Sequence, residues 1–292
     1  MKVYRPHYCE KFKCIADRCR HSCCVGWEIS VDRATLDKYN CLGREDILCH
    51  IEDGEIILSE GERCPFLLES GLCRIISELS DEYTSLICRE HPRFYHGVGD
   101  RVEGGIGLSC EEACRIILSS DRYGDFVASE HDPDVAECTD FDSISHRDYL
   151  YSVLSDENLT YINKIGKIRE KYALPELHTA EEWNEILADL ELLYEEHQGL
   201  ITLADVAGEH YEIYTRFLAY LIFRHVSVAH SYDNLRARLG FCLLLTDLLS
   251  SQTAERDMCF ADICEIARII SEEIEYSEDN TASLIFEIES EI

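Results

Sequence analysis

The sequence predicts a mainly α-helical protein, in which a loop-rich cysteine-cluster N-terminal part, stapled by a metal centre, is followed by a helical C-terminal part. Two observations lead to this fold class. Twelve of the 16 cysteines lie before residue 115, where the apparent elements are short and irregular. From about Ser109 onward, apolar residues recur at helical intervals. A segment with little regular structure to bury needs another source of stability, and a metal centre can supply it.

Regular structure in the first part is expected to be sparse. The stretches WEISVD (27–32) and GEIILSE (54–60) alternate enough to form short strands. The stretch EGGIGLS (103–109) lacks the full glycine fingerprint of a dinucleotide-binding loop. We expect it to form a turn before a helix that begins near Ser109, which has Glu112 at capping-box spacing.

The second part contains four stretches with helical character. Residues 179–197 begin with Thr179 and Glu182 at capping-box spacing. Residues 209–230, 232–251 and 257–276 follow, and each is rich in apolar side chains. The late cysteines occur in these apolar patterns and are expected to be buried thiols: Cys242, Cys259 and Cys264.

Polar composition marks a predicted boundary between the two parts and also the C-terminal end of the sequence. Residues 128–145 are polar and turn-rich, which predicts a linker between a cysteine-rich part (1–127) and a helical part (146–292). The last 22 residues contain eight acids and no bases, and they are expected to form a solvated, partly frayed helix.

Composition narrows the class of protein and its surroundings. A net charge of −31 leaves no basic footprint for nucleic acid and favours basic partners. No run of 18 apolar residues occurs, so no membrane-spanning helix is expected. The N-terminal stretch lacks the apolar core of a signal peptide, and this favours the cytoplasm. In a reducing compartment, 16 cysteines are metal ligands or buried thiols more often than disulfides.

The spacing of the early cysteines predicts a metal centre. The groups are Cys14, Cys19, Cys23 and Cys24, then Cys64 and Cys73, then Cys88, then Cys110 and Cys114. Structural zinc takes four Cys or His ligands, and iron–sulfur clusters are commonly held by four thiolates. The ligand types alone therefore leave zinc and an iron–sulfur cluster open.

Adjacent Cys23 and Cys24 are a special case within the first group. Successive side chains generally point in different directions, so both can reach one centre only in a sharply bent loop. We expect one to ligate and the other to pack or to approach a second site.

The ordered cysteine motifs resemble a known family. The stretches FKCIADRCRHSCCVGWEISVDRATLDKY, CPFLLESGLCRI, CREHPRFY and GIGLSCEEACRIIL resemble successive motifs of the flagellin lysine-N-methylase family. The later stretch YEIYTRFLAYLIFRHVSVAHSYDNLRARLGFCLLL resembles its C-terminal region. The early motifs are similar, more loosely, to zinc- or iron-chelating cysteine-cluster domains. The resemblance covers roughly residues 4 to 250.

The resemblance implies a function and a ligand set. The family transfers methyl groups from S-adenosylmethionine to lysine side chains of flagellin and uses a cysteine-bound iron–sulfur cluster, with a 4Fe-4S cluster favoured over zinc. The residues that match the family's cysteine pattern are Cys14, Cys19, Cys23, Cys24, Cys64, Cys73, Cys88 and Cys110. Eight thiols exceed the four that one such cluster requires.

Two other residues are candidates for contact with the methyl donor. Trp27 could stack on the donor, although an aromatic beside the metal loop is equally consistent with packing. Arg93 could bind the donor's carboxylate through two hydrogen bonds, or pair with one of the many acids. The sequence identifies no catalytic proton acceptor. The competing hypothesis is a non-catalytic interaction module that is held together by zinc or an iron–sulfur cluster.

Overall fold

The computed structural model describes residues 2–131, 133, 135, 140–175, 177–204, 208–254 and 257–292. The chain forms two compact units. Unit 1 comprises Met1–Phe12, Tyr95–Ser109 and Ala113–Ile292, and unit 2 comprises Lys13–Phe94 and Cys110–Glu112. The linker predicted at 128–145 includes residues outside the described ranges, Cys138 among them, and the division into 1–127 and 146–292 stays a prediction.

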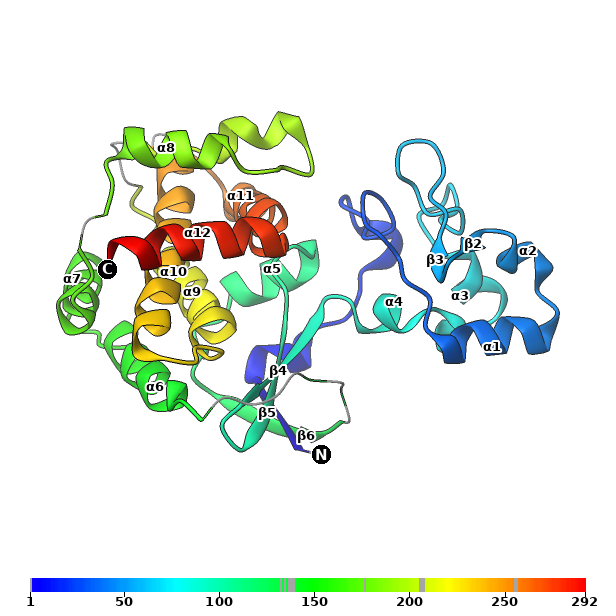
Figure 1. The fold of residues 1–292 in the computed structure, drawn as a ribbon, viewed down its shortest axis with the longest axis horizontal. Helices are drawn as coiled ribbons and strands as arrows, with labels where there is room; N and C mark the ends of the chain where they lie inside the picture. The colour runs from blue at the N-terminus through cyan, green and yellow to red at the C-terminus, as the bar shows by residue number, and fades with distance from the viewer. Residues whose placement is uncertain are drawn as a thin grey trace. The chain divides into compact units, whose positions relative to one another are not determined.

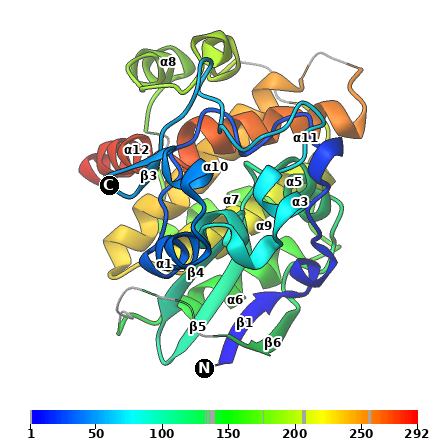
Figure 2. The ribbon, with the colours of Figure 1, turned by 90° about the vertical axis from the view of Figure 1, so that its right-hand side faces the viewer.

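Unit 1 contains a four-stranded sheet in the order β4-β5-β1-β6, and Figure 2 shows its strands side by side. The strands are β1 (Lys2–Pro6), β4 (Arg93–Val98, which begins in unit 2), β5 (Arg101–Ile106) and β6 (Phe126–Glu130). Strand β1 runs parallel to β5 and antiparallel to β6. Strand β1, at the N-terminus, therefore lies between β5 and β6, which both come from later in the chain.

The glycine-rich stretch 103–109 does not form only a turn. Its first residues, Glu103 to Ile106, lie in β5 and are buried. A Cβ on Gly104 would lie 2.8 Å from the ring of Tyr95. Glycine is therefore required here because the tyrosine ring of the neighbouring strand crosses this position.

The rest of unit 1 is helical, which confirms the predicted helical C-terminal part. Its helices are α5 (Glu111–Leu118, which begins in unit 2), α6 (Ser143–Leu154), α7 (Tyr161–Tyr172), α8 (Ala180–Ala188), α9 (Tyr211–Leu221), α10 (Tyr232–Gln252), α11 (Phe260–Ile270) and α12 (Glu278–Glu291). Short 3-10 segments cover His7–Lys11 and Glu195–Leu200. Helix α10 runs through this unit, with α9, α11 and α12 packed along it (Figure 1).

Several sequence predictions of helices are confirmed and two need correction. The capping box of Thr179 and Glu182 opens α8. Helices α9 and α11 each continue into one π-helical turn, Ile222–Val226 and Ser271–Glu275. The last residues are not simply solvated, because Leu284 and Ile288 of α12 are buried. Cys259 is exposed, since it lies at the N-cap of α11 and not on its apolar face.

Two buried acids in unit 1 are held by basic side chains. Glu103 and Arg147 are both fully buried, and Arg147 Nη2 donates to Glu103 Oε1 at 3.0 Å. Glu275 of the second π-helical turn lies 2.8 Å from Arg224 Nε and accepts a hydrogen bond from Tyr220 at 2.7 Å. Burial of each carboxylate is tolerated because it is paired with a guanidinium and accepts hydrogen bonds.

Unit 2 is built from short elements around a small apolar core. They are a 3-10 turn (Ala16–Arg18), α1 (Arg33–Leu42), α2 (Glu45–Leu48), β2 (Ile51–Glu52), β3 (Glu55–Ile56), α3 (Arg74–Glu78), a second 3-10 turn (Asp81–Tyr83) and α4 (Leu86–Glu90). The predicted strand at 54–60 is reduced to β3, and in the predicted strand at 27–32 only Ser30 forms a bridge, to Glu55.

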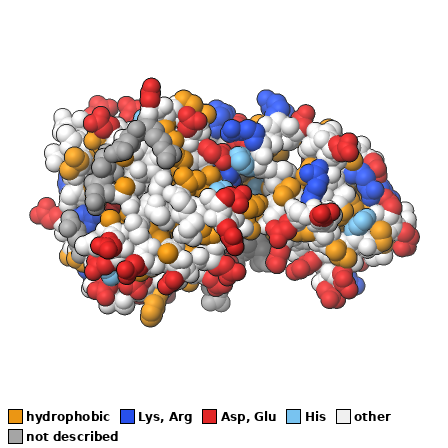
Figure 3. All heavy atoms as spheres, turned by 90° about the horizontal axis from the view of Figure 1, so that it is seen from above, with side chains coloured by type: hydrophobic (Ala, Val, Ile, Leu, Met, Phe, Trp, Pro, Cys, Tyr) orange, Lys and Arg blue, Asp and Glu red, His pale blue; other side chains and the backbone are white. Residues whose placement is uncertain are grey.

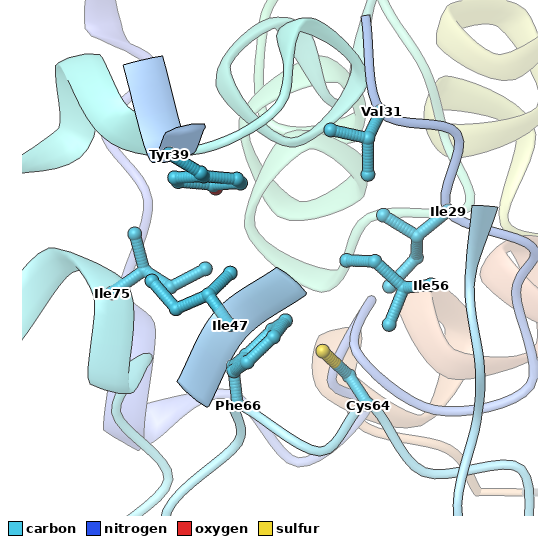
Figure 4. Close-up of a cluster of buried hydrophobic side chains, with 8 residues drawn as sticks. All are labelled: Ile29, Val31, Tyr39, Ile47, Ile56, Cys64, Phe66 and Ile75. Carbon is cyan, nitrogen blue, oxygen red and sulfur yellow. The ribbon is translucent and has the colours of Figure 1, made fainter. Parts of the chain in front are cut away.

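The core of unit 2 includes a cysteine. Figure 4 shows Cys64 beside Phe66 and Ile56 in a cluster of buried side chains. Its members are Ile29, Val31, Tyr39, Ile47, Ile56, Cys64, Phe66 and Ile75. Cys24 and Cys73 are partly buried and pack against this cluster. The thiols of Cys24, Cys64 and Cys73 thus belong to this apolar core or pack against it.

Surface properties agree with the composition. Acidic side chains are spread over the face that Figure 3 presents, as the net charge of −31 requires. Within the described ranges, none of the helices combines the length and apolar character that crossing a bilayer demands.

Candidate metal centre

All eight cysteines that match the family pattern lie in unit 2. Seven belong to its main segment, residues 13–94, and Cys110 belongs to the short segment 110–112. By contrast, Cys242 and Cys264 are buried in the helices of unit 1. The fold thus separates the predicted ligands from the predicted core thiols.

Four of the cysteines form what we call the inner group: Cys24, Cys64, Cys73 and Cys88. Backbone pairing links the first three. The Cys64 amide donates to the Cys24 carbonyl at 2.8 Å, and Val25 bridges to Arg63. Cys73 is joined to the same turn by its bridge to Leu67, whose amide donates to the Cys64 carbonyl at 3.1 Å.

Helix α4 brings the fourth thiol of the inner group. Asp32 caps α1 through the Thr35 amide, and its second carboxylate oxygen accepts from the Leu86 amide at 2.8 Å. This contact anchors the start of α4 to α1. The Ser85 hydroxyl then donates to Cys88 Sγ at 3.1 Å.

The inner thiols share one electrostatic environment. The pKa of Cys64 is raised to about 12, mainly by burial, and the charges of Cys24, Cys88 and Cys73 contribute to this shift. Burial also raises the pKa of Cys88, with further increases from Cys24 and Cys73. Each thiolate therefore opposes ionisation of the others, as expected for sulfurs near enough to act on one another through their charges.

Polar hydrogens point at the same sulfurs. The Phe66 amide donates to Cys64 and thereby lowers its pKa, against the larger effect of burial. The amides of Ile76 and Ile75 act in the same way on Cys73, whose pKa burial raises overall. Such donors stabilise thiolates and accompany metal-bound sulfur in proteins. The donor set of the inner group thus fits a centre that requires four thiolates.

The other four cysteines form what we call the outer group: Cys14, Cys19, Cys23 and Cys110. Hydrogen bonds between Arg20 and Glu111 connect the segment that carries Cys14, Cys19 and Cys23 to the segment that carries Cys110. Arg20 donates to Glu111 from its backbone amide at 2.8 Å and from Nε at 3.1 Å. Cys19 Sγ lies 3.8 Å from Glu111 Oε2. The pKa of Cys19 is raised to about 11, mainly by burial, with contributions from the charges of Glu111, Cys110 and Cys14.

The pKa values of the adjacent thiols Cys23 and Cys24 are shifted in opposite directions. A hydrogen bond from the Cys23 thiol lowers the pKa of Cys24 to about 6, and Ser22 and Arg63 also lower it. The same hydrogen bond raises the pKa of Cys23, as do burial and the charges of Cys24, Cys88 and Cys14. Cys24 is therefore the thiolate of the pair.

The two predicted donor-contact residues also lie in unit 2. Trp27 is half-buried and directly follows Gly26, whose φ of 78° ends the Cys23–Cys24 loop. Arg93 Nη1 donates to the Arg89 carbonyl at 3.4 Å, one residue after Cys88. Burial, together with the charge of Arg93, lowers the pKa of the nearby His91 to about 4. His91 is therefore neutral near pH 7.

Three side chains of unit 1 meet the distance requirement of a metal site, and among the described residues no set of three cysteines does. Within the described residues, donor atoms of His197, Glu272 and Glu273 all lie within 4.8 Å of one another. Glu273 already accepts from His197 at 2.5 Å and from the Leu193 amide at 2.6 Å, and Glu272 pairs with Arg268 at 2.8 Å. These contacts explain the group as a cap of the segment 195–200.

Unit 1 also contains a partly open pocket of about 310 Å³ lined by residues of α7, α8, α10 and α12. Leu243, Leu244 and Ile288 form part of its wall. Its charged residues Arg169 and Asp247 are paired at 3.8 Å. The thiols of unit 2 therefore remain the richest concentration of reactive groups that we find in the described residues.

Comparison with known proteins gives the chain its family. It is 31% identical over 130 residues to the lysine-N-methylase of Salmonella typhimurium, a match that spans 40% of this chain and 32% of that protein. It is 30% identical over 130 residues to the flagellar biosynthetic protein FliU of Salmonella muenchen, of which the match spans 77%. The chain belongs to the lysine-N-methylase and FliU family.

The chain matches only part of the length of the lysine-N-methylases. The match spans about a third, 32%, of the lysine-N-methylases of Salmonella typhimurium and Salmonella choleraesuis. No family model matches the chain. No solved structure matches it either.

Some residues of the site were not identified from the sequence. Glu111 and Arg20 are separated by 91 positions, and only the fold brings them together. Ser85, by contrast, precedes Cys88 by three positions on the first turn of a helix, and this spacing was a usable signal.

Proposed function

We infer that this protein is a protein lysine N-methylase, which transfers methyl groups from S-adenosylmethionine to lysines of flagellin and depends on a cysteine-bound iron–sulfur cluster. Family membership supports the methylase class. The observation that supports the cluster is the inner group, whose four cysteines belong to one compact unit and of which Cys24, Cys64 and Cys73 are linked by backbone pairing. Four thiolates are the usual ligand set of a 4Fe-4S cluster, and zinc is the alternative.

The ligands of this cluster are the inner group, Cys24, Cys64, Cys73 and Cys88. When bound, an iron–sulfur cluster supplies one-electron transfer and a Lewis-acidic metal. The residues of the chain hold it through the amide and hydroxyl groups that donate to Cys64, Cys73 and Cys88. Of the adjacent pair Cys23 and Cys24, Cys24 is the ligand, because its thiol has the lower pKa.

The net reaction sets what the remaining residues must do. The sulfur–methyl bond of the donor breaks, a nitrogen–methyl bond forms on lysine, and one proton leaves the lysine ammonium. In this proposal Trp27 stacks on the aromatic part of the donor, and the Arg93 guanidinium binds its carboxylate. Both lie in the unit that carries the cysteines.

The charge of the protein suits a lysine-bearing substrate. A net charge of −31 attracts basic surfaces over distances comparable to the Debye length. Association with flagellin should therefore weaken as the salt concentration rises.

The test is intact-mass spectrometry of the cognate flagellin after anaerobic incubation with the protein, S-adenosylmethionine and a reductant. We expect mass increments of about 14 Da on lysines, since each methyl replaces a hydrogen. Cys88→Ser should abolish the increments, and Cys242→Ser, in a buried thiol of unit 1, should not. Unmodified flagellin with the cluster-loaded wild type, together with no donor binding by calorimetry, would leave the metal-held interaction module as the better account.

A further inference from the structure

The pocket of unit 1 takes no part in the proposed methylation. Its volume of about 310 Å³ falls at the lower end of the range that small-molecule sites occupy in proteins. Residues of α7, α8, α10 and α12 line it, and all of these belong to unit 1. A ligand bound there would therefore be held by one compact unit, without a contribution from the cysteines of unit 2.

Much of the pocket wall is apolar. Helix α12 crosses α10 (Figure 1), and Leu243, Leu244 and Ile288 of these two helices are buried where they line the pocket. A Cβ on Gly240 would lie 2.9 Å from Ile288 Cγ2, so glycine lets the two helices approach closely at this wall. Trp183 of α8 adds an aromatic ring. Such a wall selects a ligand with an apolar body.

One charged side chain of α10 interrupts this apolar surface. Among residues 241–250 of the helix, Asp247 is exposed and all the others are buried. Its side chain is 56% exposed and is one of those that line the pocket. The most buried helix of unit 1 thus presents a carboxylate to the pocket.

Asp247 faces a single basic partner, and the contact is loose. Arg169 Nη2 of α7 lies 3.8 Å from Asp247 Oδ2, beyond hydrogen-bond distance, whereas Arg224 Nε lies 2.8 Å from Glu275. As far as the described residues go, the Asp247 carboxylate accepts no hydrogen bond. Arg169 donates one, from Nη1 to the Pro175 carbonyl at 3.3 Å, and a guanidinium has five N–H groups. Both charges can therefore still bind a ligand.

The two charges define the polar end of that ligand. A simple amine would be attracted by Asp247 and repelled by Arg169, and a simple carboxylate would meet the reverse. A zwitterion avoids both conflicts. An α-amino acid carries its ammonium and its carboxylate on one carbon atom, so the ammonium can donate to Asp247 while the carboxylate accepts from the Arg169 guanidinium.

We propose that this pocket binds an α-amino acid with an apolar side chain, which packs against Leu243, Leu244 and Ile288 while Asp247 and Arg169 hold its charged end. S-adenosylmethionine carries the same zwitterionic end and is a second source of this chemistry. The proposal does not rest on the proposed function, which assigns the contacts of the methyl donor to residues of unit 2.

The experiment is calorimetric titration of the full chain with L-leucine, L-methionine and L-phenylalanine. Two analogues of leucine each lack one charge: leucinamide has no carboxylate, and 4-methylpentanoate has no ammonium. We expect at least one of the amino acids to bind. If leucine binds, each analogue should bind at least about ten-fold more weakly, because each loses hydrogen bonds between charged groups.

Variants assign the binding to the pocket. Asp247→Asn and Arg169→Gln should each weaken amino-acid binding at least about ten-fold. Asp125→Asn is the matched control, because Asp125 is 54% exposed and pairs with Arg122 elsewhere in unit 1. It should leave the affinity unchanged. Circular dichroism of each variant separates loss of binding from loss of folding.

Competition identifies the source of the ligand. If S-adenosylmethionine displaces the amino acid and Asp247→Asn weakens both, the pocket takes the amino-acid end of the methyl donor. If S-adenosylmethionine does not displace it, the ligand is a free amino acid. Either of two results overturns the proposal: none of these compounds binds, or Asp247→Asn binds them all as tightly as the wild type. None of the measurements requires methylation activity, so failure of the proposed function would leave them unaffected.

Discussion

Cys64 has two possible roles, packing and metal binding, and one substitution separates them. It is 6% exposed in the core of unit 2, and Cys242 is 0% exposed in α10 of unit 1. Truncating either to alanine removes one buried sulfur, which costs about 1 kcal/mol or somewhat more when only packing is lost. In metal-free protein we therefore expect Cys64→Ala and Cys242→Ala to be similarly destabilising.

The two variants should diverge when metal is bound. A ligand at 100 times its dissociation constant stabilises the folded state by about 2.7 kcal/mol, and structural metal centres reach higher values. Cys64→Ala should lose most of this contribution, so it should cost about 4 kcal/mol or more in the loaded protein. Cys242→Ala should still cost about 1 kcal/mol.

The two tryptophans allow each unit to be followed separately. Trp27 lies in unit 2 and Trp183 in unit 1, and the chain has two tryptophans. In a Trp183→Phe background, the fluorescence of Trp27 reports urea unfolding of unit 2, and a Trp27→Phe background reports unit 1. Measured anaerobically with and without reconstituted metal, an equal cost of Cys64→Ala in both states would refute its role as a ligand.

Three further predictions concern the scaffold. Burial alone would raise the pKa of Glu103, but the neighbouring His96 and the hydrogen bonds and charge of Arg147 lower it to about 2. A lowered folded-state pKa stabilises the native state above the unfolded value of about 4.3 and is lost as pH falls toward the folded value. Unit 1 should thus lose about 3 kcal/mol between roughly pH 5 and pH 2, as urea titrations followed by Trp183 would detect. Glu103→Gln should flatten that pH dependence and destabilise unit 1 by about 3 kcal/mol at pH 7, because Arg147 stays buried without its carboxylate; an unchanged acid profile would contradict the assignment. Gly71→Ala should lower the stability of unit 2 by about 1 kcal/mol or more, because Gly71 has a φ of 79° and an added Cβ would contact the Asp17 Cα at 3.2 Å. Wild-type stability of Gly71→Ala in the Trp27 signal would argue against that contact.

The helical half was predictable because its signals are local. Thr179 and Glu182 lie three residues apart and form the capping box that their spacing predicts. The stretch 232–251 is apolar enough to be buried, and it forms α10. Local patterns were insufficient for the π-helical turns after α9 and α11, since these depend on packing of buried polar groups such as Glu275 and Arg224.

The sheet and the grouping of cysteines depend on distant pairings. Strand β1 pairs with β5 and β6, about a hundred residues later, and nothing within its five residues specifies those partners. The same holds for the cysteines. Spacing identified the set of eight, but the division into inner and outer groups follows from tertiary contacts, such as the Cys64 amide to the Cys24 carbonyl and Arg20 to Glu111.

The size of its core makes unit 2 the part that should depend on metal. Eight buried residues, one of them Cys64, form the cluster at its centre, and its longest helix, α1, has 10 residues. Small cores of this kind commonly require a metal or other cross-links to remain folded. In unit 1, by contrast, the 21-residue α10 is buried among other helices.

Removing metal with a chelator should therefore speed hydrogen exchange of amides in α1, α3 and α4 by at least about ten-fold, which corresponds to about 1.4 kcal/mol. Exchange in α10 should stay unchanged. Uniform acceleration across both units would mean that metal stabilises the chain as one cooperative body, and unchanged exchange in unit 2 would mean that its apolar core is sufficient without metal.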